Sequence, residues 1–415
     1  MKTQLVPRLI YSAVQLVTIV GLPATLLLCA AMVLQGDIGT EIVLRVEREE
    51  GHPGVPSATI HADENGKRYA VAHDTDKRVV ICTEVADGNI EVNSRFQLPE
   101  DGVPTAAIPY GTGHLCVLDL RGKLWFFRNT EQTGWKAELV GVLKSPRKEI
   151  LSGVQPCAYH PKCGVIFASA FGSDEIWVVS VNDADHPKLL QRVAGKRAGD
   201  VTDDEVGTHQ ETSVAQLESP GAMVLTKDGR DLYVLDFNTP SIVHFRVSQT
   251  DGTLTFASVY DRKTIQGEKR LIPHSILGPR AIAVSSDGKQ VYVGGDGNSL
   301  GIFERDANSG AIKLSDVLFD EMPGLSAMDS IIAIQTSRDG KTLAVTCRDS
   351  HSILLFERDE NDKLKLRRQM GPLKDKAFRG LSDAVPTTGK DTVIITSSGV
   401  VMAVVRSKEP QVREP

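Results

Sequence analysis

The sequence lacks any cysteine pattern that would define a disulfide scaffold or a haem site. Apart from Cys29 it contains five cysteines, an odd number, with no C-x-x-C pair and no C-x-x-C-H signature. Cys82, Cys116 and Cys347 lie in apolar, strand-like runs, where a small buried side chain is the expected role. We therefore predict neither a disulfide framework nor a cofactor.

Motifs of the known hydrolases and nucleotide-binding proteins are missing as well. The chain has no Ser-His-Asp order, G-x-S-x-G elbow, Walker loop or zincin motif. Its net charge of −6 argues against binding to a phosphate backbone, so nucleic acid is not an expected partner. Hydrolysis by one of these routes has no support in the sequence.

Charged residues are absent between Arg8 and Asp37, and this apolar run is long enough to cross a bilayer as a helix. The basic residues precede the run and the acidic ones follow it, which places everything after Asp37 outside the cytoplasm. Residues 1–36 are thus predicted to be a signal anchor or a signal peptide. The length of the run favours a retained membrane anchor, whereas cleavage would give a secreted or periplasmic protein.

Three stretches of the chain repeat one order of strands and turns. In "GPRAIAVSSDGKQVYVGG" an alternating strand, an Asp-Gly turn at Asp287–Gly288 and a second strand follow one another, and "SLGIFERD" and "AIKLSDVLF" add two more. The same pattern recurs around Gly229 and Gly340. Each stretch predicts a four-stranded antiparallel meander.

Weaker copies bring the number of repeats to seven. Their turn glycines are Gly66, Gly113, Gly164 and Gly389. A spacing of roughly 50 residues is close to the period of four-stranded propeller blades. The last copy lacks a fourth strand, while the strand-like Glu41–Glu49 precedes the first copy. We predict an all-β, seven-bladed β-propeller over residues 37–410, preceded by one hydrophobic helix and closed by residues 41–49 as the outer strand of the last blade.

The tetrapeptide Phe-Glu-Arg-Asp occurs at Phe303–Asp306 and again at Phe356–Asp359. Both copies fall in the third strand of their repeats. We expect the two phenylalanines to pack between neighbouring sheets, because repeat units bury the same face each time. The Glu-Arg-Asp that follows is expected to solvate the strand end and begin the next turn.

Strand order then defines two faces of the propeller. The tight Asp-Gly turns lie on one face, and the loops between second and third strands lie on the other with the longer connections between blades, where binding is expected. Six aspartates follow the second strands: Asp74, Asp119, Asp174, Asp236, Asp296 and Asp349. Such a ring of carboxylates suits Ca²⁺. An aspartate at the start of a loop also forms hydrogen bonds to its own backbone and so shapes the turn, and its repetition in six blades favours this structural role.

Two motifs carry a family resemblance that extends from Glu41 to about Ser407. "GPRAIAVSSDGKQVYV" is similar to a Gly-Pro-Arg-His strand with an Asp/Asn-Gly-Lys turn, and "CRDSHSILLFERD" is similar to an Asn-Arg-Gly-His-Asp-Ser-Ile run. Both resemble the seven-bladed lactonase-type propellers. That family includes bacterial 6-phosphogluconolactonase, carboxymuconate-cyclising enzymes and surface proteins with Tyr-Val-x-Asn repeats.

The resemblance implies that Arg280 and Arg348 hold an anionic substrate or polarise a lactone carbonyl. Ala281 and Ser350 stand where the family has histidines, which leaves the role of the base unassigned. The nearest substitutes on the proposed face are His274, His351 and Asp349.

Two functions therefore stay open. The protein is either an exported lactonase-like propeller that hydrolyses or binds a small anionic lactone or sugar acid, or a non-catalytic extracytoplasmic propeller that docks a protein or polymer partner. The 6-phosphogluconolactonase activity itself is not expected, because its sugar-phosphate substrate is cytosolic.

Overall fold

The computed structural model describes residues 40–47, 58–85, 89–131, 135–144, 156–170, 172–195, 210–320, 322, 325–371, 375, 378–389 and 391–407. Within these ranges, no helix has the length and apolar composition needed to cross a membrane. The hydrophobic segment of residues 1–36 lies outside the described residues, as does the predicted boundary at residue 410. The N-terminal helix and the domain boundaries therefore stay predictions.

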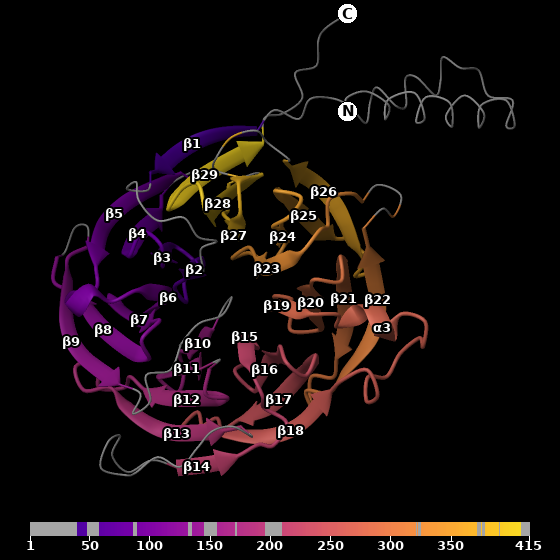
Figure 1. Ribbon diagram of the computed structural model, residues 1–415, viewed down its shortest axis with the longest axis horizontal. Helices are drawn as coiled ribbons and strands as arrows, with labels where there is room; N and C mark the ends of the chain where they lie inside the picture. Colours follow the sequence, from indigo (N-terminus) through magenta and orange to yellow (C-terminus); the bar gives the residue numbers. More distant parts are fainter. Residues whose placement is uncertain are drawn as a thin grey trace, which may run out of the picture. The chain divides into compact units, whose positions relative to one another are not determined.

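Residues 42–406 form one compact unit, in which seven sheets follow one another around a ring (Figure 1). The other unit comprises the two ends of the chain, of which the structure describes Thr40, Glu41 and Ser407. Each sheet is a meander whose first strand lies innermost in the ring. The prediction of an all-β, seven-bladed propeller is confirmed.

The first three blades hold strands β2 to β14. Blade 1 consists of β2 (Ala58–Ala62), β3 (Arg68–His73), β4 (Arg78–Glu84) and β5 (Ile90–Gln97). A 3-10 turn, η2 (Pro99–Asp101), leads to blade 2, which consists of β6 (Pro104–Tyr110), β7 (His114–Asp119), β8 (Lys123–Asn129) and β9 (Ala137–Lys144). Blade 3 consists of β10 (Cys157–His160), β11 (Val165–Ala170), β12 (Glu175–Ser180), β13 (Lys188–Ala194) and β14 (Gln210–Ser213).

The remaining blades hold the other strands and one short helix. Blade 4 consists of β15 (Pro220–Leu225), β16 (Asp231–Asp236), β17 (Ser241–Val247) and β18 (Leu254–Tyr260). After helix α3 (Ile272–Ser275), blade 5 consists of β19 (Pro279–Val284), β20 (Gln290–Gly295), β21 (Ser299–Arg305) and β22 (Ile312–Phe319). Blade 6 consists of β23 (Ile331–Thr336), β24 (Thr342–Cys347), β25 (Ser352–Arg358) and β26 (Leu364–Met370). Blade 7 consists of β27 (Leu381–Pro386), β28 (Thr392–Ser397), β29 (Met402–Ser407) and β1 (Thr40–Val46).

Blade 3 departs from the predicted four strands. Its fifth strand, β14, runs parallel to β13 in a segment that the sequence pattern leaves as a loop. Polar side chains hold it there: Arg192 forms an ion pair with Glu211, and the Gln191 amide donates a hydrogen bond to the Thr212 hydroxyl (2.9 Å). The sequence of β14, QETS, has none of the apolar alternation that identifies the other strands. The sequence pattern therefore does not predict this strand.

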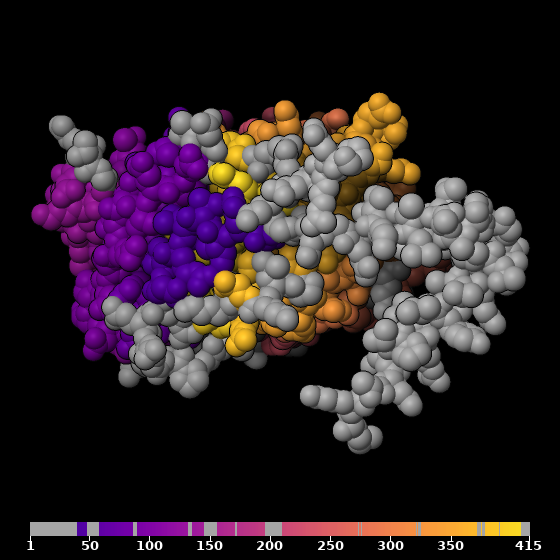
Figure 2. All heavy atoms as spheres, turned by 90° about the horizontal axis from the view of Figure 1, so that it is seen from above, coloured from indigo at the N-terminus to yellow at the C-terminus, as the bar shows by residue number. Residues whose placement is uncertain are grey.

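The two ends of the ring meet in blade 7. Its sheet has the order β1-β29-β28-β27, so the first strand of the chain lies outside the last one. Figure 2 shows indigo and yellow residues side by side on the outer surface. Blade 7 thus joins residues that are far apart in the sequence, and β1 covers the edge that β29 would otherwise expose.

Apolar side chains between neighbouring blades form the core. Phe303 lies in the hydrophobic cluster shared by blades 4 and 5, and Phe356 in the cluster shared by blades 5 and 6. Both rings are fully buried, which confirms their predicted packing between sheets. Middle strands such as β20 are buried along their whole length because both of their faces meet another blade, whereas the outer strand β22 alternates buried and exposed residues.

The arginine of the repeated Phe-Glu-Arg-Asp motif contradicts the predicted solvation of the strand end. Arg305 is buried and pairs with Asp231 and Asp228 of blade 4. Its counterpart Arg358 pairs with Asp287 of blade 5 at 2.9 Å. Asp228 and Asp287 belong to the Asp-Gly turns of those blades. The motif therefore ties each blade to the turn of the preceding one, because a buried guanidinium needs a carboxylate partner.

Candidate functional site

The two arginines singled out by the family motifs lie on the loop face, at the ends of their strands. Arg280 begins β19, and its guanidinium forms a two-point ion pair with the carboxylate of Asp296, at 2.6 and 2.9 Å. The same guanidinium lies over the ring of Phe237, 4.9 Å from the ring centre. Both charged partners are only partly exposed, so Arg280 is oriented before any ligand arrives.

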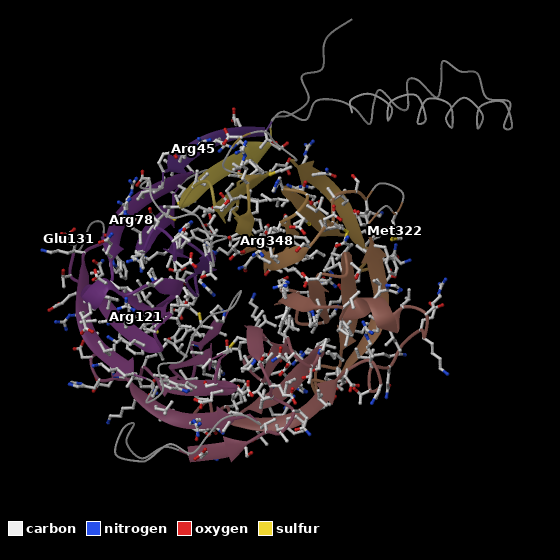
Figure 3. The ribbon with its side chains drawn as sticks, in the orientation of Figure 1. Arg45, Arg78, Arg121, Glu131, Met322 and Arg348 are labelled. Atoms are coloured by element: carbon white, nitrogen blue, oxygen red, sulfur yellow. The ribbon has the colours of Figure 1, made fainter. Side chains whose placement is uncertain are left out.

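Arg348 follows β24 and is held differently. Figure 3 shows it near the central opening of the ring. Its side chain is half-buried, its Nε atom is buried, and no ion pair or hydrogen bond reaches that guanidinium from the described residues. Burial lowers the pKa of Arg348, and the positive charge of Arg280 lowers it further. The carboxylates of Asp349 and Asp296 act in the opposite direction.

The residues around Arg348 supply one candidate base. His351 has a backbone φ of 52°, its N–H donates to the carbonyl of Arg348 (3.2 Å), and its Nδ1 atom is buried without a hydrogen-bond partner in the described part of the chain. Ser350 donates its hydroxyl to the carbonyl of Ala327 at 2.6 Å. Asp349 is exposed. The loop therefore brings Arg348, Asp349 and His351 together within four residues.

His274 and Ala281 contribute nothing to this group. Helix α3, which contains His274, packs against β21 and β22, the outer strands of blade 5 (Figure 1). The His274 ring meets Phe319 edge-on, with ring centres 5.1 Å apart. Ala281 is fully buried in the cluster between blades 5 and 6, so the position of the missing family histidine faces the core.

Four of the six aspartates that follow the second strands bond to neighbouring groups. Asp119 accepts hydrogen bonds from the backbone of Arg121 and from the indole of Trp125. Asp236 accepts from three backbone N–H groups, Asp74 accepts from the backbone of Thr75, and Asp296 pairs with Arg280. Asp174 is buried at a positive φ, and Asp349 is exposed. In the part of the chain that the structure describes, no group of three acidic, histidine or cysteine residues is placed to hold a metal ion.

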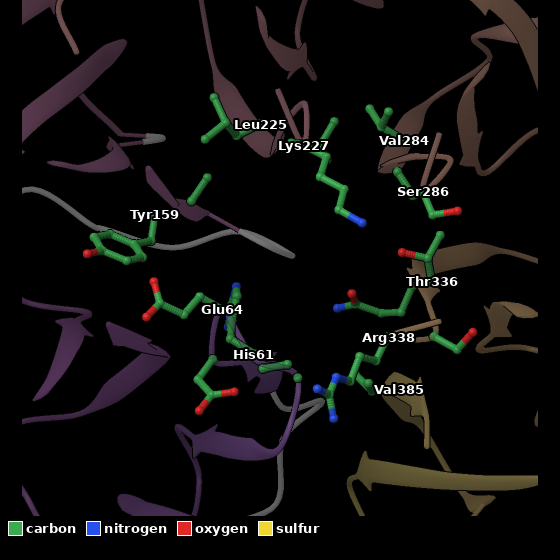
Figure 4. Close-up of a pocket in the computed structure, with 18 of the residues that line it drawn as sticks. His61, Glu64, Tyr159, Leu225, Lys227, Val284, Ser286, Thr336, Arg338 and Val385 are labelled. Carbon is green, nitrogen blue, oxygen red and sulfur yellow. The ribbon is translucent and has the colours of Figure 1, made fainter. Parts of the chain in front are cut away.

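A cavity lies on the other face, where the sequence pattern indicates only tight turns. It has a volume of about 550 Å³ and occupies the centre of the ring (Figure 4). Residues from the turns of several blades form its mouth: Glu64, Lys227, Ser286 and Arg338. Each of these residues precedes its turn glycine by two positions. Comparing that position between repeats would have indicated the charges at this end of the channel.

Buried polar groups lie beneath this cavity. Asp383 in β27 accepts hydrogen bonds from the backbone of Ile60 (2.9 Å) and from the side chain of Gln335 (3.3 Å), and so links blades 7, 1 and 6. It is completely buried, and this burial raises its pKa to about 7. His61 lies in the cavity wall with its Nε2 atom 3.6 Å from the sulfur of Cys157. Burial lowers the pKa of His61 to about 4, so its imidazole is neutral at pH 7.

A match to a known family adds to this geometry. Residues 197–321 match the family model described as "Lactonase, 7-bladed beta-propeller". The chain is a seven-bladed β-propeller, and part of it is similar to the lactonase family of such propellers. The matched residues contain blades 4 and 5, and with them Arg280, whereas Arg348 lies beyond the match. No curated protein matches the chain in sequence.

Solved structures share the architecture of this lactonase-like propeller. A protein from Lactobacillus plantarum is 17% identical with a TM-score of 0.61, and the alignment covers 83% of this chain and 92% of that one. The periplasmic gluconolactonase of Pseudomonas aeruginosa is 16% identical with a TM-score of 0.54, covering 78% and 87%. A chain of a mitotic checkpoint complex is 10% identical with a TM-score of 0.60, covering 90% and 93%. At these identities the similarity shows the fold alone.

Proposed function

We propose that this protein is an exported lactonase-like propeller that binds a small anionic lactone or sugar acid between Arg280 and Arg348. Export rests on the apolar run between Arg8 and Asp37. The ligand class rests on two guanidinium groups of the loop face, of which Arg280 acts electrostatically on Arg348, and on the gluconolactonase among the structural neighbours. Protease accessibility of the intact cells tests the location, because only an exported domain is cleaved from outside.

The unpaired guanidinium of Arg348 is the observation that carries this proposal. An arginine keeps its charge at neutral pH, and a half-buried charge costs free energy unless an anion accompanies it. Arg280 is already neutralised by Asp296, whereas no ion pair joins Arg348 to any described residue. A ligand carboxylate between the two guanidinium groups would supply the missing negative charge. Such a bound anion would also relieve the repulsion between Arg348 and Arg280.

The same arrangement suits the hydrolysis of a lactone. A guanidinium beside the ester carbonyl stabilises the negative charge that develops on the oxygen when water attacks. We propose that His351 of this loop accepts the proton of that water, since its Nδ1 atom has no partner among the described residues. We assign Arg348 to charge stabilisation and His351 to proton transfer.

Binding is tested with the full-length protein in detergent, titrated calorimetrically with D-gluconate. Arg348→Ala should weaken binding by at least about tenfold, because a charge-assisted contact is lost. Asp296→Asn should strengthen binding by roughly threefold to tenfold, because it frees the guanidinium of Arg280 for the ligand. Arg230→Gln, an exposed change on the opposite face, serves as the control.

The two variants separate ligand binding from a structural role. If Arg348 had a structural role alone, Arg348→Ala would lower stability, and Asp296→Asn would not raise the affinity for gluconate. Unchanged affinity in Arg348→Ala would remove the proposed site. Hydrolysis is followed separately as proton release from D-glucono-δ-lactone, and His351→Gln should slow it without changing gluconate affinity.

The alternative is a non-catalytic propeller that docks a protein or polymer partner. The buried position of Ala281 favours it, because this site lacks the polar group that the family places there. The fold is compatible with partner binding, since one structural neighbour is part of a mitotic checkpoint complex. Absence of both gluconate binding and lactone hydrolysis would support this alternative.

A further inference from the structure

We propose that the central cavity on the turn face is a second ligand site, which takes a small zwitterion with an apolar side chain, such as a hydrophobic dipeptide. This site is separate from the arginine pair, since none of the cavity-lining residues belongs to the loop face. Its volume of about 550 Å³ is in the range of small-molecule sites and exceeds the needs of a few trapped waters.

Part of the cavity wall is apolar. Inner strands of several blades contribute aliphatic side chains to it, among them Leu225, Val284 and Val385 (Figure 4). An aliphatic ligand side chain that enters this zone is removed from water and gains the free energy of apolar burial. This wall therefore selects for a ligand with an apolar part.

Charges of both signs surround the mouth without neutralising one another. Figure 4 shows Lys227 at the top of the cavity and Arg338 at its lower right, with Glu64 and Tyr159 on the left. Within the described residues, no ion pair involves Lys227, Arg338 or Glu64. Unpaired cations opposite an unpaired carboxylate fit a ligand that carries a carboxylate and an ammonium group at once.

Arg338 reaches across the mouth towards blade 1. A side chain added at Gly66 would meet its Cγ atom at 2.7 Å, so this arginine of blade 6 lies over the turn of blade 1. The position brings the guanidinium to the cavity entrance, where it would meet the ligand carboxylate. Glycine at position 66 leaves the room that this crossing needs, and its φ of 61° also favours glycine.

An unpartnered buried atom is an independent sign of a missing ligand. The Nδ1 atom of His61 is buried, and the described residues offer it no hydrogen-bond partner. The sulfur of Cys157 lies 3.6 Å from Nε2 of His61, and the tautomer of the imidazole decides which of these two groups donates. In the tautomer with the proton on Nδ1, a ligand carbonyl, such as that of a peptide bond, would accept a hydrogen bond from this atom.

The test is calorimetric titration of the full-length protein with L-leucyl-L-leucine. Binding is expected, and the variants Glu64→Gln, Lys227→Gln and Arg338→Gln should each weaken it by about tenfold, since each removes one charged contact. All three residues are exposed, so these variants should fold normally. Arg230→Gln is the matched control, because Arg230 is in the same turn as Lys227 but does not line the cavity.

Two chemical variants of the probe examine each charge of the ligand. N-acetylated leucyl-leucine lacks the ammonium group and leucyl-leucine amide lacks the carboxylate, and both should bind more weakly than the zwitterion. Equal binding of the N-acetylated form would show a simple anion site and overturn the proposal. Absence of leucyl-leucine binding would overturn it too, as would loss of this binding in Arg348→Ala, which alters only the loop face.

Discussion

At the scale of single residues, the two faces of the ring differ in how they handle charge. On the loop face Asp296 orients Arg280, and Arg348 stays without an ion pair in the described structure. At the centre of the ring, Asp383 is buried and accepts hydrogen bonds from Ile60 and Gln335 instead of pairing with a cation. A carboxyl group without a cation keeps its proton to a higher pH, because ionisation in the protein interior is costly.

Asp383 should therefore give the protein an unusual pH dependence. Its pKa is about 7 in the folded protein and 3.8 in an ordinary environment, so the folded state holds one more proton than the unfolded state between these values. Stability from this group falls as pH rises from about 4 to 7 and then stays constant. Asp383→Asn, which imitates the protonated carboxyl, should gain stability relative to the natural protein over that range.

Urea unfolding of both proteins at several pH values measures this difference. The difference between the two proteins removes the contributions that the other titrating groups make to stability. One of these is Asp287, whose lowered pKa affects stability at more acidic pH. A stability difference that is the same at pH 4 and pH 7 would contradict the raised pKa of Asp383.

At the scale of elements, the Asp-Gly hairpins of blades 4 and 5 each bind an arginine of the following blade. In blade 5 the hydroxyl of Ser285 donates to Asp287 (2.7 Å), and the backbone of Gln290 donates to the same hydroxyl (2.9 Å). The polar groups of the Ser-x-Asp-Gly turn thus form hydrogen bonds with one another, and one carboxylate oxygen of Asp287 remains for Arg358 of blade 6. Turn chemistry and blade packing are therefore parts of one repeated device.

The two arginines of the repeated motif should differ in their contribution to stability. Arg305→Met removes a cation from fully buried Asp231 and should lower the free energy of unfolding by about 3 kcal/mol. Arg358→Met affects Asp287, which is partly exposed, and should cost only about 1 kcal/mol. Urea unfolding of both variants compares the same repeat position at two degrees of burial, and equal losses would contradict this account.

At the scale of the whole molecule, closure of the ring removes free sheet edges. Strand β1 pairs with β29, although β1 ends at Val46 and β29 begins only at Met402. A ring held in this way unfolds as one body, since loss of one strand exposes an edge and uncovers the neighbouring blade.

Deletion of Glu41–Glu49 should therefore destabilise all seven blades rather than blade 7 alone. We expect a lower melting temperature with a single transition, and a stronger tendency to aggregate through the exposed edge of β29. Circular dichroism during heating measures the transition. An unchanged melting curve would show that β1 does not hold the ring together.

The sequence by itself determined the repeat, the seven blades and the resemblance to lactonases, because burial between blades forces the same apolar alternation and the same glycine turns in each copy. It also identified Arg280 and Arg348 through local motifs. Only the tertiary structure decided which charges meet. Glu64, Lys227 and Arg338 come from different blades and converge in one cavity, and Arg305 crosses to the turn of another blade. Such contacts join residues far apart in the chain, and no local pattern records them.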